Sequence, residues 1–253
     1  MNKSIIGLLY LVILCASPLA VASSSLPDVI DRNRDSIVAV GTVKPLRRPS
    51  AQFMGTGFVV GDGHLVITNF HVIPDLIDSA KNEKLAVFSG RGENAKAHIA
   101  TIVKSDPDHD LVLLKISSGP LPALPLASSA LIREGESIAF TGFPIGMVLG
   151  LYPITHRGII SAITPIIIPS NNSKDLTAKS IRRMRNKFQV YQLDGTAYPG
   201  NSGSPVYHAE SGKVIGVLNS VFVKDTKETL LERPSGISYA IPIKYVHSLL
   251  NTR

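Results

Sequence analysis

The sequence predicts an all-β protein that consists of two six-stranded, barrel-sized units and a short C-terminal helix. From Ser36 onward, short runs of β-branched and other apolar residues alternate with Gly, Pro, Asn and Asp, a spacing typical of sandwiches and barrels. A connector rich in Pro, Ser and Gly at residues 117–128 divides these runs into two sets of six. The sequence shows no internal repeat and no coiled-coil heptads.

The first element is a segment typical of a secretory signal peptide. Lys3 precedes an apolar run at residues 5–16, and residues 20–22 place small side chains where cleavage would occur. The run is shorter than the roughly 20 apolar residues that a membrane-spanning helix needs. We therefore expect residues 1–22 to be removed on export.

The cysteine content favours a bacterial periplasm over animal extracellular fluid. Cys15 is the single cysteine of the sequence, and it lies within the expected signal peptide. A lipid-modified Cys15 is an alternative, but Leu14 before it is bulkier than lipoprotein signals usually have. The mature chain, residues 23–253, would then lack the disulfides common in extracellular animal proteins.

Each of the two units contains six predicted strands. The first unit covers residues 33–116, and its strands are expected at residues 37–43, 52–60, 65–69, 84–88, 96–104 and 111–116. The second unit covers residues 129–241, and its strands are expected at residues 137–142, 154–163, 188–193, 204–207, 214–221 and 237–241.

Two short helical segments flank the strands. Residues 26–35 predict a helical turn with acidic residues near its start. Residues 242–251 predict the C-terminal helix, because Pro242 suits the start of a helix and Tyr245 and Leu249 lie along one face.

The strongest functional signal is the turn Gly200-Asn201-Ser202-Gly203. A serine between glycines in a tight turn can project its hydroxyl, and glycine allows the positive φ that such a turn needs. We expect an oxyanion hole over Gly200, Asn201 and Ser202, with the Gly200 and Ser202 amides as donors. An isolated turn of this kind is also common between strands, so the signal needs support elsewhere in the chain.

Two upstream motifs supply that support. Residues 68–72 (TNFHV) end a predicted strand with His71, a candidate general base. Residues 106–110 (DPDHD) lead directly into a buried strand with Asp110, a candidate acid that orients the imidazole. With Ser202 as nucleophile, these residue types are the parts needed for acyl transfer.

Each of these residues has local rivals. Asp106 and Asp108 compete with Asp110, which we prefer because it adjoins the apolar run that would fix its backbone. Ser204 competes with Ser202, but Ser204 precedes a proline at a strand entry. The other histidines lack the strand context of His71 and are expected to be structural or on the surface: His64, His98, His109, His156, His208 and His247.

The order His, Asp, Ser and the flanking residues resemble the chymotrypsin-like serine proteases, and more narrowly the HtrA/Deg branch. The resemblance extends to residues 142–146 (GFPIG) and 158–162 (GIISA). It implies two six-stranded antiparallel barrels and a cofactor-independent endopeptidase that acts on extended or unfolded polypeptides. HtrA-like domains are often trimers. Many continue into PDZ domains, and we expect this chain to be a protease domain without one.

The resemblance also places a specificity pocket and a mode of activation. The pocket would be lined by Thr196, Tyr198, Asn219, Ser220 and Val221. Because none of these pocket residues is acidic, we expect a small or medium apolar side chain (Val, Ala, Ile or Leu) before the cleaved bond. Asn201 replaces the aspartate with which the trypsin branch binds a new N-terminus, so loops 164–187 and 194–199 are expected to switch the oxyanion hole instead.

A basic cluster at Lys174–Lys187 contains the main excess of positive charge. Six lysines and arginines surround Asp175, whereas loss of Lys3 lowers the formal net charge of +7 by one, to +6. The cluster could contact a polyanion or an anionic membrane surface. The alternative is a solvated surface loop, and no alternation of basic and aromatic residues indicates nucleic-acid binding.

Two other functions fit the same residues less well. A chaperone-like or peptide-binding module would keep the fold without turnover, which the complete His-Asp-Ser set disfavours. An esterase of the α/β-hydrolase type would need a G-x-S-x-G elbow and the order Ser, Asp, His. No metal site is predicted, since the histidines are scattered without HExxH or paired cysteines.

Overall fold

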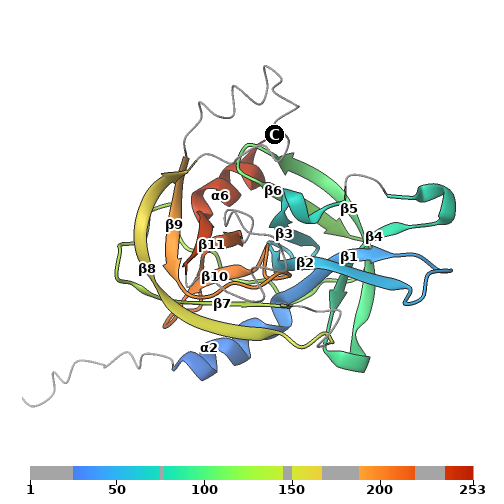
Figure 1. Cartoon of the computed structure of the whole chain (residues 1–253), viewed down its shortest axis with the longest axis horizontal. Helices are drawn as coiled ribbons and strands as arrows, with labels where there is room; N and C mark the ends of the chain where they lie inside the picture. Colours follow the sequence, from blue (N-terminus) through green and yellow to red (C-terminus); the bar gives the residue numbers. More distant parts are fainter. Residues whose placement is uncertain (1–24, 75–76, 145–149, 167–187, 220–236, 253) are drawn as a thin grey trace, which may run out of the picture.

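The strands of the protein form two closed antiparallel barrels, as predicted (Figure 1). The computed structural model describes residues 25–74, 77–144, 150–166, 188–219 and 237–252. In Figure 1 barrel one (β1–β6) is drawn in blue to green, and barrel two (β7–β12) in yellow-green to red beside it.

Barrel one has the strand order β1-β2-β3-β6-β5-β4 and closes through β1 and β4. Its strands are β1 (Ile37–Val43), β2 (Ala51–Val60), β3 (Leu65–Asn69), β4 (Lys84–Ser89), β5 (Lys96–Asp106) and β6 (Leu111–Ile116). Neighbouring β3 and β6 run antiparallel, with Asn69 opposite Leu111, so the end of β3 lies beside the start of β6.

Barrel two has the order β10-β11-β12-β9-β8-β7 and closes through β7 and β10. Its strands are β7 (Ser137–Gly142), β8 (Ile154–Ile166), β9 (Phe188–Asp194), β10 (Pro205–His208), β11 (Val214–Asn219) and β12 (Ile237–Pro242). The two barrels repeat the same strand order, so the fold is the predicted chymotrypsin-like pair.

Alternate residues of the central strands serve two different cores. Val112 and Leu114 of β6 fill the interior of barrel one, whereas Leu111 and Leu113 belong to a second apolar cluster. That second cluster also contains Val217 and other residues of barrel two, so it lies between the barrels. Because both faces of β6 are buried, its sequence is an apolar run rather than an alternating one.

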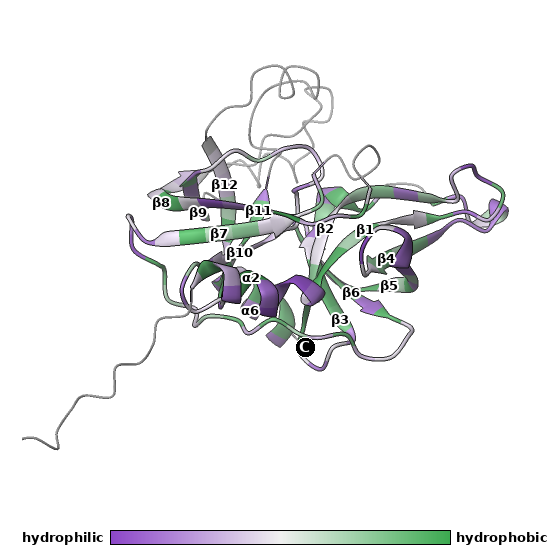
Figure 2. Ribbon diagram, turned by 90° about the horizontal axis from the view of Figure 1, so that it is seen from below, coloured by the Kyte–Doolittle hydropathy of each residue, from purple (hydrophilic) through white to green (hydrophobic). Residues whose placement is uncertain are grey.

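Two helices pack on the outside of the strands. α2 (Leu26–Asn33) packs Val29 against Ala139 and Tyr207 of barrel two, although it precedes the first strand of barrel one. α6 (Ile243–Asn251) packs its apolar face, including Val246, on the cluster between the barrels. In Figure 2 the ribbon of α2 includes several residues coloured as hydrophilic.

The predicted strands differ from the observed ones mainly at their ends. β5 runs on to Asp106 and β8 to Ile166, past the predicted ends, because a bulge in each strand lets pairing continue while the strand bends. The bulge in β5 leaves Ile102 and Val103 exposed. β11 is described as far as Asn219, so the predicted end of this strand at residues 220–221 lies outside the described residues.

Candidate active site

His71 and Asp110 come together because they flank paired strands. His71 lies in η2 (Phe70–Val72), a one-turn 3₁₀ helix directly after β3, and Asp110 directly precedes β6. The backbone amide of Phe70 donates to the Asp110 carbonyl at 3.0 Å, and the Asn69 side chain donates to the same carbonyl at 3.1 Å. The β3–β6 pairing therefore places both residues at one rim of barrel one.

The Asp110 carboxylate orients the His71 ring. Oδ2 lies 2.6 Å from His71 Nδ1, and Oδ1 accepts the His71 backbone amide at 2.9 Å. Because a carboxylate can only accept, we assign the proton to Nδ1, which leaves Nε2 as an acceptor. Asp110 has a φ of 54°, a left-handed conformation that aspartate tolerates better than most residues and that recurs at functional sites.

A third donor reaches Asp110 from barrel two. The fully buried Asn219, the last residue of β11, donates from Nδ2 to Asp110 Oδ2 at 2.6 Å. The resemblance found in the sequence places Asn219 in the pocket and does not predict this contact with Asp110. The sequence signal that could have found it is a polar residue ending an otherwise apolar strand.

The turn that contains Ser202 is held by its own backbone. Gly200 and Gly203 have φ values of 97° and 86°, so both use the freedom that the sequence predicts for them. The Asn201 backbone amide donates to the Tyr198 carbonyl at 3.0 Å. Of the three residues of the expected oxyanion hole, Asn201 therefore has its amide already hydrogen-bonded within the turn. Ser202 itself is buried, with 4% of its surface exposed.

The Ser202 turn lies against the strands that lead to His71. The Thr56 amide of β2 donates to the Ser202 carbonyl at 2.8 Å. A Cβ on neighbouring Gly55 would come within 2.7 Å of the Val72 side chain and 3.0 Å of the same carbonyl. The structure thus brings the chain around His71, Asp110 and Ser202 to one junction of the two barrels.

The rival residues have settings of their own. Asp106 Oδ2 lies 2.7 Å from His109 Nδ1; burial acts to raise the pKa of Asp106, but the hydrogen bonds and charge of His109 outweigh it and lower the pKa. Asp108 is exposed. Ser204 is fully buried, and its hydroxyl has no hydrogen-bond partner among the described residues.

The remaining histidines each have a structural setting. His109 stacks on Tyr245 with ring centroids 4.1 Å apart, and His156 stacks on Phe140 at 5.0 Å. Burial lowers the pKa of His156. The other contacts of this group join His64 to Asp62, His98 to Ser89, His208 to Glu136 and His247 to the Ala127 carbonyl.

The expected pocket is described in part. Thr196 and Tyr198 are half-buried, and the Tyr198 ring lies 5.9 Å from that of His156. Ser220, Val221, the basic cluster at Lys174–Lys187 and the signal segment lie outside the described residues.

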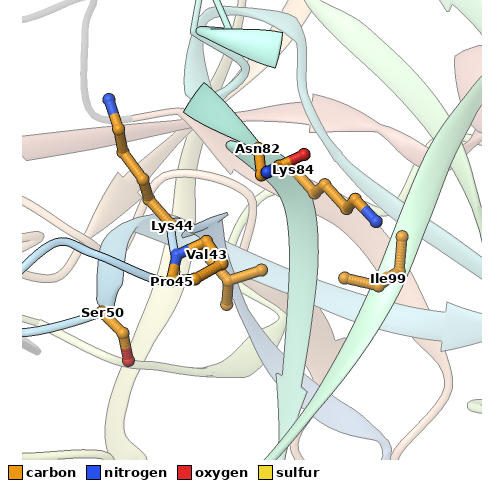
Figure 3. Close-up of a pocket in the computed structure, with 7 residues that line it drawn as sticks. All are labelled: Val43, Lys44, Pro45, Ser50, Asn82, Lys84 and Ile99. Atoms are coloured by element: carbon orange, nitrogen blue, oxygen red, sulfur yellow. The ribbon is translucent and has the colours of Figure 1, made fainter. Parts of the chain in front are cut away.

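A separate cavity of about 410 Å³ lies on barrel one and shares no residue with this site. Figure 3 shows its lining: Val43, Lys44, Pro45, Ser50, Asn82, Lys84 and Ile99. Two lysines, Lys44 and Lys84, line the cavity, and the Lys44 ammonium is already paired with Asp78 at 3.0 Å. Within the described part of the chain, no cluster of three metal-ligating side chains occurs and no helix is long and apolar enough to cross a bilayer.

The chain is similar to known proteins in sequence and in fold. Residues 55–217 match the model of a trypsin-like peptidase domain. A protein of Marinomonas sp. (strain MWYL1), named a probable periplasmic serine endoprotease of the DegP-like type, is 28% identical over 213 residues, 83% of this chain and 38% of that protein. The mitochondrial serine protease HTRA2 of Bos taurus is 30% identical over 198 residues, 78% of this chain and 35% of that protein. The chain spans little more than a third of the length of these relatives.

Solved structures share the fold. The HtrA-type protease AlgW with a tripeptide has a TM-score of 0.61 at 26% identity, and the match covers 89% of this chain and 62% of AlgW. A protease of M. tuberculosis in its active form has a TM-score of 0.64 at 22% identity, covering 88% of this chain and 82% of that one, a likeness of fold alone.

Proposed function

This chain belongs to the trypsin-like peptidase family, and from that membership we propose that it is a serine endopeptidase that hydrolyses peptide bonds in extended polypeptides. The observation that carries the proposal is the 2.6 Å contact between His71 Nδ1 and Asp110 Oδ2, at the junction where the Ser202 turn meets barrel one. This arrangement is the one that activates a hydroxyl nucleophile.

Ser202, His71 and Asp110 are assigned as nucleophile, base and orienting acid. Ser202 Oγ bonds to the substrate carbonyl carbon while its proton passes to His71 Nε2 and the carbonyl electron pair moves onto oxygen. The intermediate then collapses, the C–N bond breaks, and the His71 proton passes to the leaving amine. Water attacks the resulting ester in the same way, which releases the acid and restores Ser202. Asp110 stabilises the imidazolium during both steps.

The amides of Gly200 and Ser202 are assigned as the donors that stabilise the developing oxyanion. Asn201 lies between them, and its own amide donates to Tyr198. Fixed donors aimed at the oxyanion act without reorganisation, and loss of one costs about 100- to 1,000-fold in rate.

The substrate would be an extended peptide held by main-chain hydrogen bonds, as in other strand-binding grooves. Thr196, Tyr198 and Asn219 carry no negative charge, and Ser220 and Val221 complete the proposed pocket. We therefore expect cleavage after Val, Ala, Ile or Leu rather than after Lys or Arg. Peptide libraries that vary only this position would measure the preference.

Export to the periplasm is part of the proposal. It is supported by the signal-like residues 1–22 and by relatives that are named periplasmic endoproteases. Assembly into trimers and contact of Lys174–Lys187 with polyanions remain proposals from the family resemblance and the charge pattern. Heparin added to a peptidase assay should alter the rate if the cluster regulates the site.

The test compares wild type with Ser202→Ala on casein and with a fluorophosphonate probe that labels activated serines. The proposal expects cleavage and labelling by wild type, and loss of both in a folded variant. Full cleavage by Ser202→Ala would refute the assignment. Absence of cleavage and labelling in the wild type would favour the chaperone-like alternative.

A further inference from the structure

Thr56 makes four hydrogen bonds at the point where barrel one meets the Ser202 turn. This residue of β2 is fully buried. Its amide donates to the Ser202 carbonyl at 2.8 Å, and its hydroxyl donates to the Gly200 carbonyl at 2.7 Å. The hydroxyl also accepts the Phe143 amide at 3.0 Å, and the Thr56 carbonyl accepts the Thr68 hydroxyl at 2.6 Å. Thr56 therefore binds two carbonyls of the turn, those of Gly200 and Ser202.

The direction of the hydroxyl bond is forced by its partners. A backbone amide can only donate, so the Thr56 oxygen must accept from Phe143. The single hydroxyl proton is then available only for the Gly200 carbonyl, which can only accept. The bond to Gly200 is thus a specific contact rather than one of several choices of a rotating hydroxyl.

The Gly200–Asn201 peptide needs such a contact. Gly200 has no Cβ and a φ of 97°, so sterics alone do not select its conformation. Thr56 holds the carbonyl of this peptide, and Tyr198 accepts its N–H at 3.0 Å. Both ends of the peptide are fixed, and one of them is fixed by a side chain from the other barrel.

The peptide after Ser202 is fixed in the same manner. Its carbonyl accepts the Thr56 amide, and its N–H, that of Gly203, donates to the Leu218 carbonyl at 2.9 Å. The Ser202 amide lies between these two fixed peptides, and the carbonyl of its own peptide accepts the Ser204 amide at 3.0 Å. The orientation of the Ser202 amide follows from these neighbours.

The polar side chains inside the turn do not replace Thr56. Within the described residues, neither polar atom of the buried Asn201 amide has a hydrogen-bond partner, and neither does Ser204 Oγ. A Cβ on Gly142 would collide with that Ser204 hydroxyl, which shows how closely β7 packs here. Side-chain support for the turn carbonyls comes from barrel one.

We propose that Thr56 is a positioning residue for the oxyanion hole: its hydroxyl holds the Gly200 carbonyl, and through it the Gly200 and Ser202 amides keep the orientation that binds the oxyanion. The proposal rests on the function proposed above. It adds that the hole is set by the contact between the barrels, not by the turn alone.

The test compares Thr56→Val, which removes the hydroxyl but keeps the branched shape, with Thr56→Ser, which keeps the hydroxyl. We expect Thr56→Val to lower kcat by about 10- to 100-fold, less than deletion of an oxyanion donor, with KM within about twofold because ground-state binding is unchanged. The affinity for a peptide aldehyde, whose adduct with Ser202 carries the oxyanion, should fall in parallel. Thr56→Ser should restore kcat to within about threefold of wild type.

Thr42→Val is the matched control. Thr42 is a buried threonine of β1, and its hydroxyl donates to Glu83 at 2.7 Å, away from the turn. This variant should lower the melting temperature without changing kcat or aldehyde affinity.

A Thr56→Val enzyme with unchanged kcat and aldehyde affinity would overturn the proposal. If Thr56→Val does not fold, Thr56→Ser still decides, because a tenfold loss of kcat with the hydroxyl present would contradict the proposed role. If Ser202→Ala abolishes hydrolysis while Thr56→Val does not slow it, only the Thr56 proposal fails. If Ser202→Ala stays active, the proposed function itself fails.

Discussion

Replacement of Asn219 by leucine should slow peptide hydrolysis by about 10- to 150-fold while leaving the chain folded. Asn219 Nδ2 donates to Asp110 Oδ2 at 2.6 Å, the same oxygen that contacts His71 Nδ1. Leucine is similar in size to asparagine and cannot donate, so the substitution removes this bond with little change in packing.

The magnitude follows from the charge on the acceptor. A hydrogen bond to a charged group contributes about 1.5–3 kcal/mol. Removing the donor from a buried carboxylate costs a free energy in the upper part of this range. At 1.36 kcal/mol for each factor of ten, this corresponds to the expected range of slowing. The loss should appear in kcat, because Asp110 acts on the imidazole rather than on the bound peptide.

The assay is steady-state hydrolysis of a peptide with an apolar residue before the cleaved bond, with a thermal melt of each variant. Asn33→Leu is the matched control. Asn33, the last residue of α2, is also a buried asparagine, and its side chain donates to the Gly212 carbonyl at 2.9 Å. The control should lose stability and keep its kcat.

Two results would contradict this reasoning. A folded Asn219→Leu enzyme with kcat within twofold of wild type would show that Asp110 does not need this donor. A loss confined to KM would mean that Asn219 acts as a wall of the pocket, as the sequence first indicated, rather than through Asp110.

Three further predictions concern stability. Gly203→Ala should cost about 3 kcal/mol or more in urea unfolding, because φ is 86° and a Cβ would collide with the Thr56 carbonyl oxygen. Burial lowers the pKa of His156 from 6.5, so the folded ring binds a proton less readily than the unfolded one and stability falls as pH falls below that value. His156→Phe should therefore weaken the loss of melting temperature between pH 7.5 and 5.5, although His98, whose pKa burial and Lys96 also lower, leaves part of it. Lys104→Met should cost about 1 kcal/mol, since the ammonium donates to carbonyls at the end of α6 at 3.2 and 3.4 Å.

Each of these has a clear contrary outcome. Gly203→Ala with an unchanged unfolding midpoint would mean that the turn can move away from β2. A His156→Phe variant with the same pH slope as wild type would assign that slope to other groups. Lys104→Met without faster amide exchange in the last turn of α6 would show that the helix end needs no cation.

Local patterns determined most of the fold and the choice of the candidate catalytic side chains. The apolar runs between turn residues predicted the two sets of six strands, because strand burial leaves a direct mark on sequence. Asp110 was preferred over Asp106 because it adjoins such a run, and the structure places Asp110, not Asp106, on His71. The prediction of His71 and Ser202 rests on short motifs for the same reason: their settings are local.

Contacts between the barrels were decided only in the tertiary structure. Asn219 meets Asp110 across 109 residues of sequence, and Thr56 meets Gly200 across 144. A polar residue at the end or in the middle of an apolar strand has the same appearance in sequence whether it faces solvent, a pocket or a partner. Which of these applies depends on how two closed barrels, each with its own register, pack against each other, and that arrangement leaves no periodic signal in the chain.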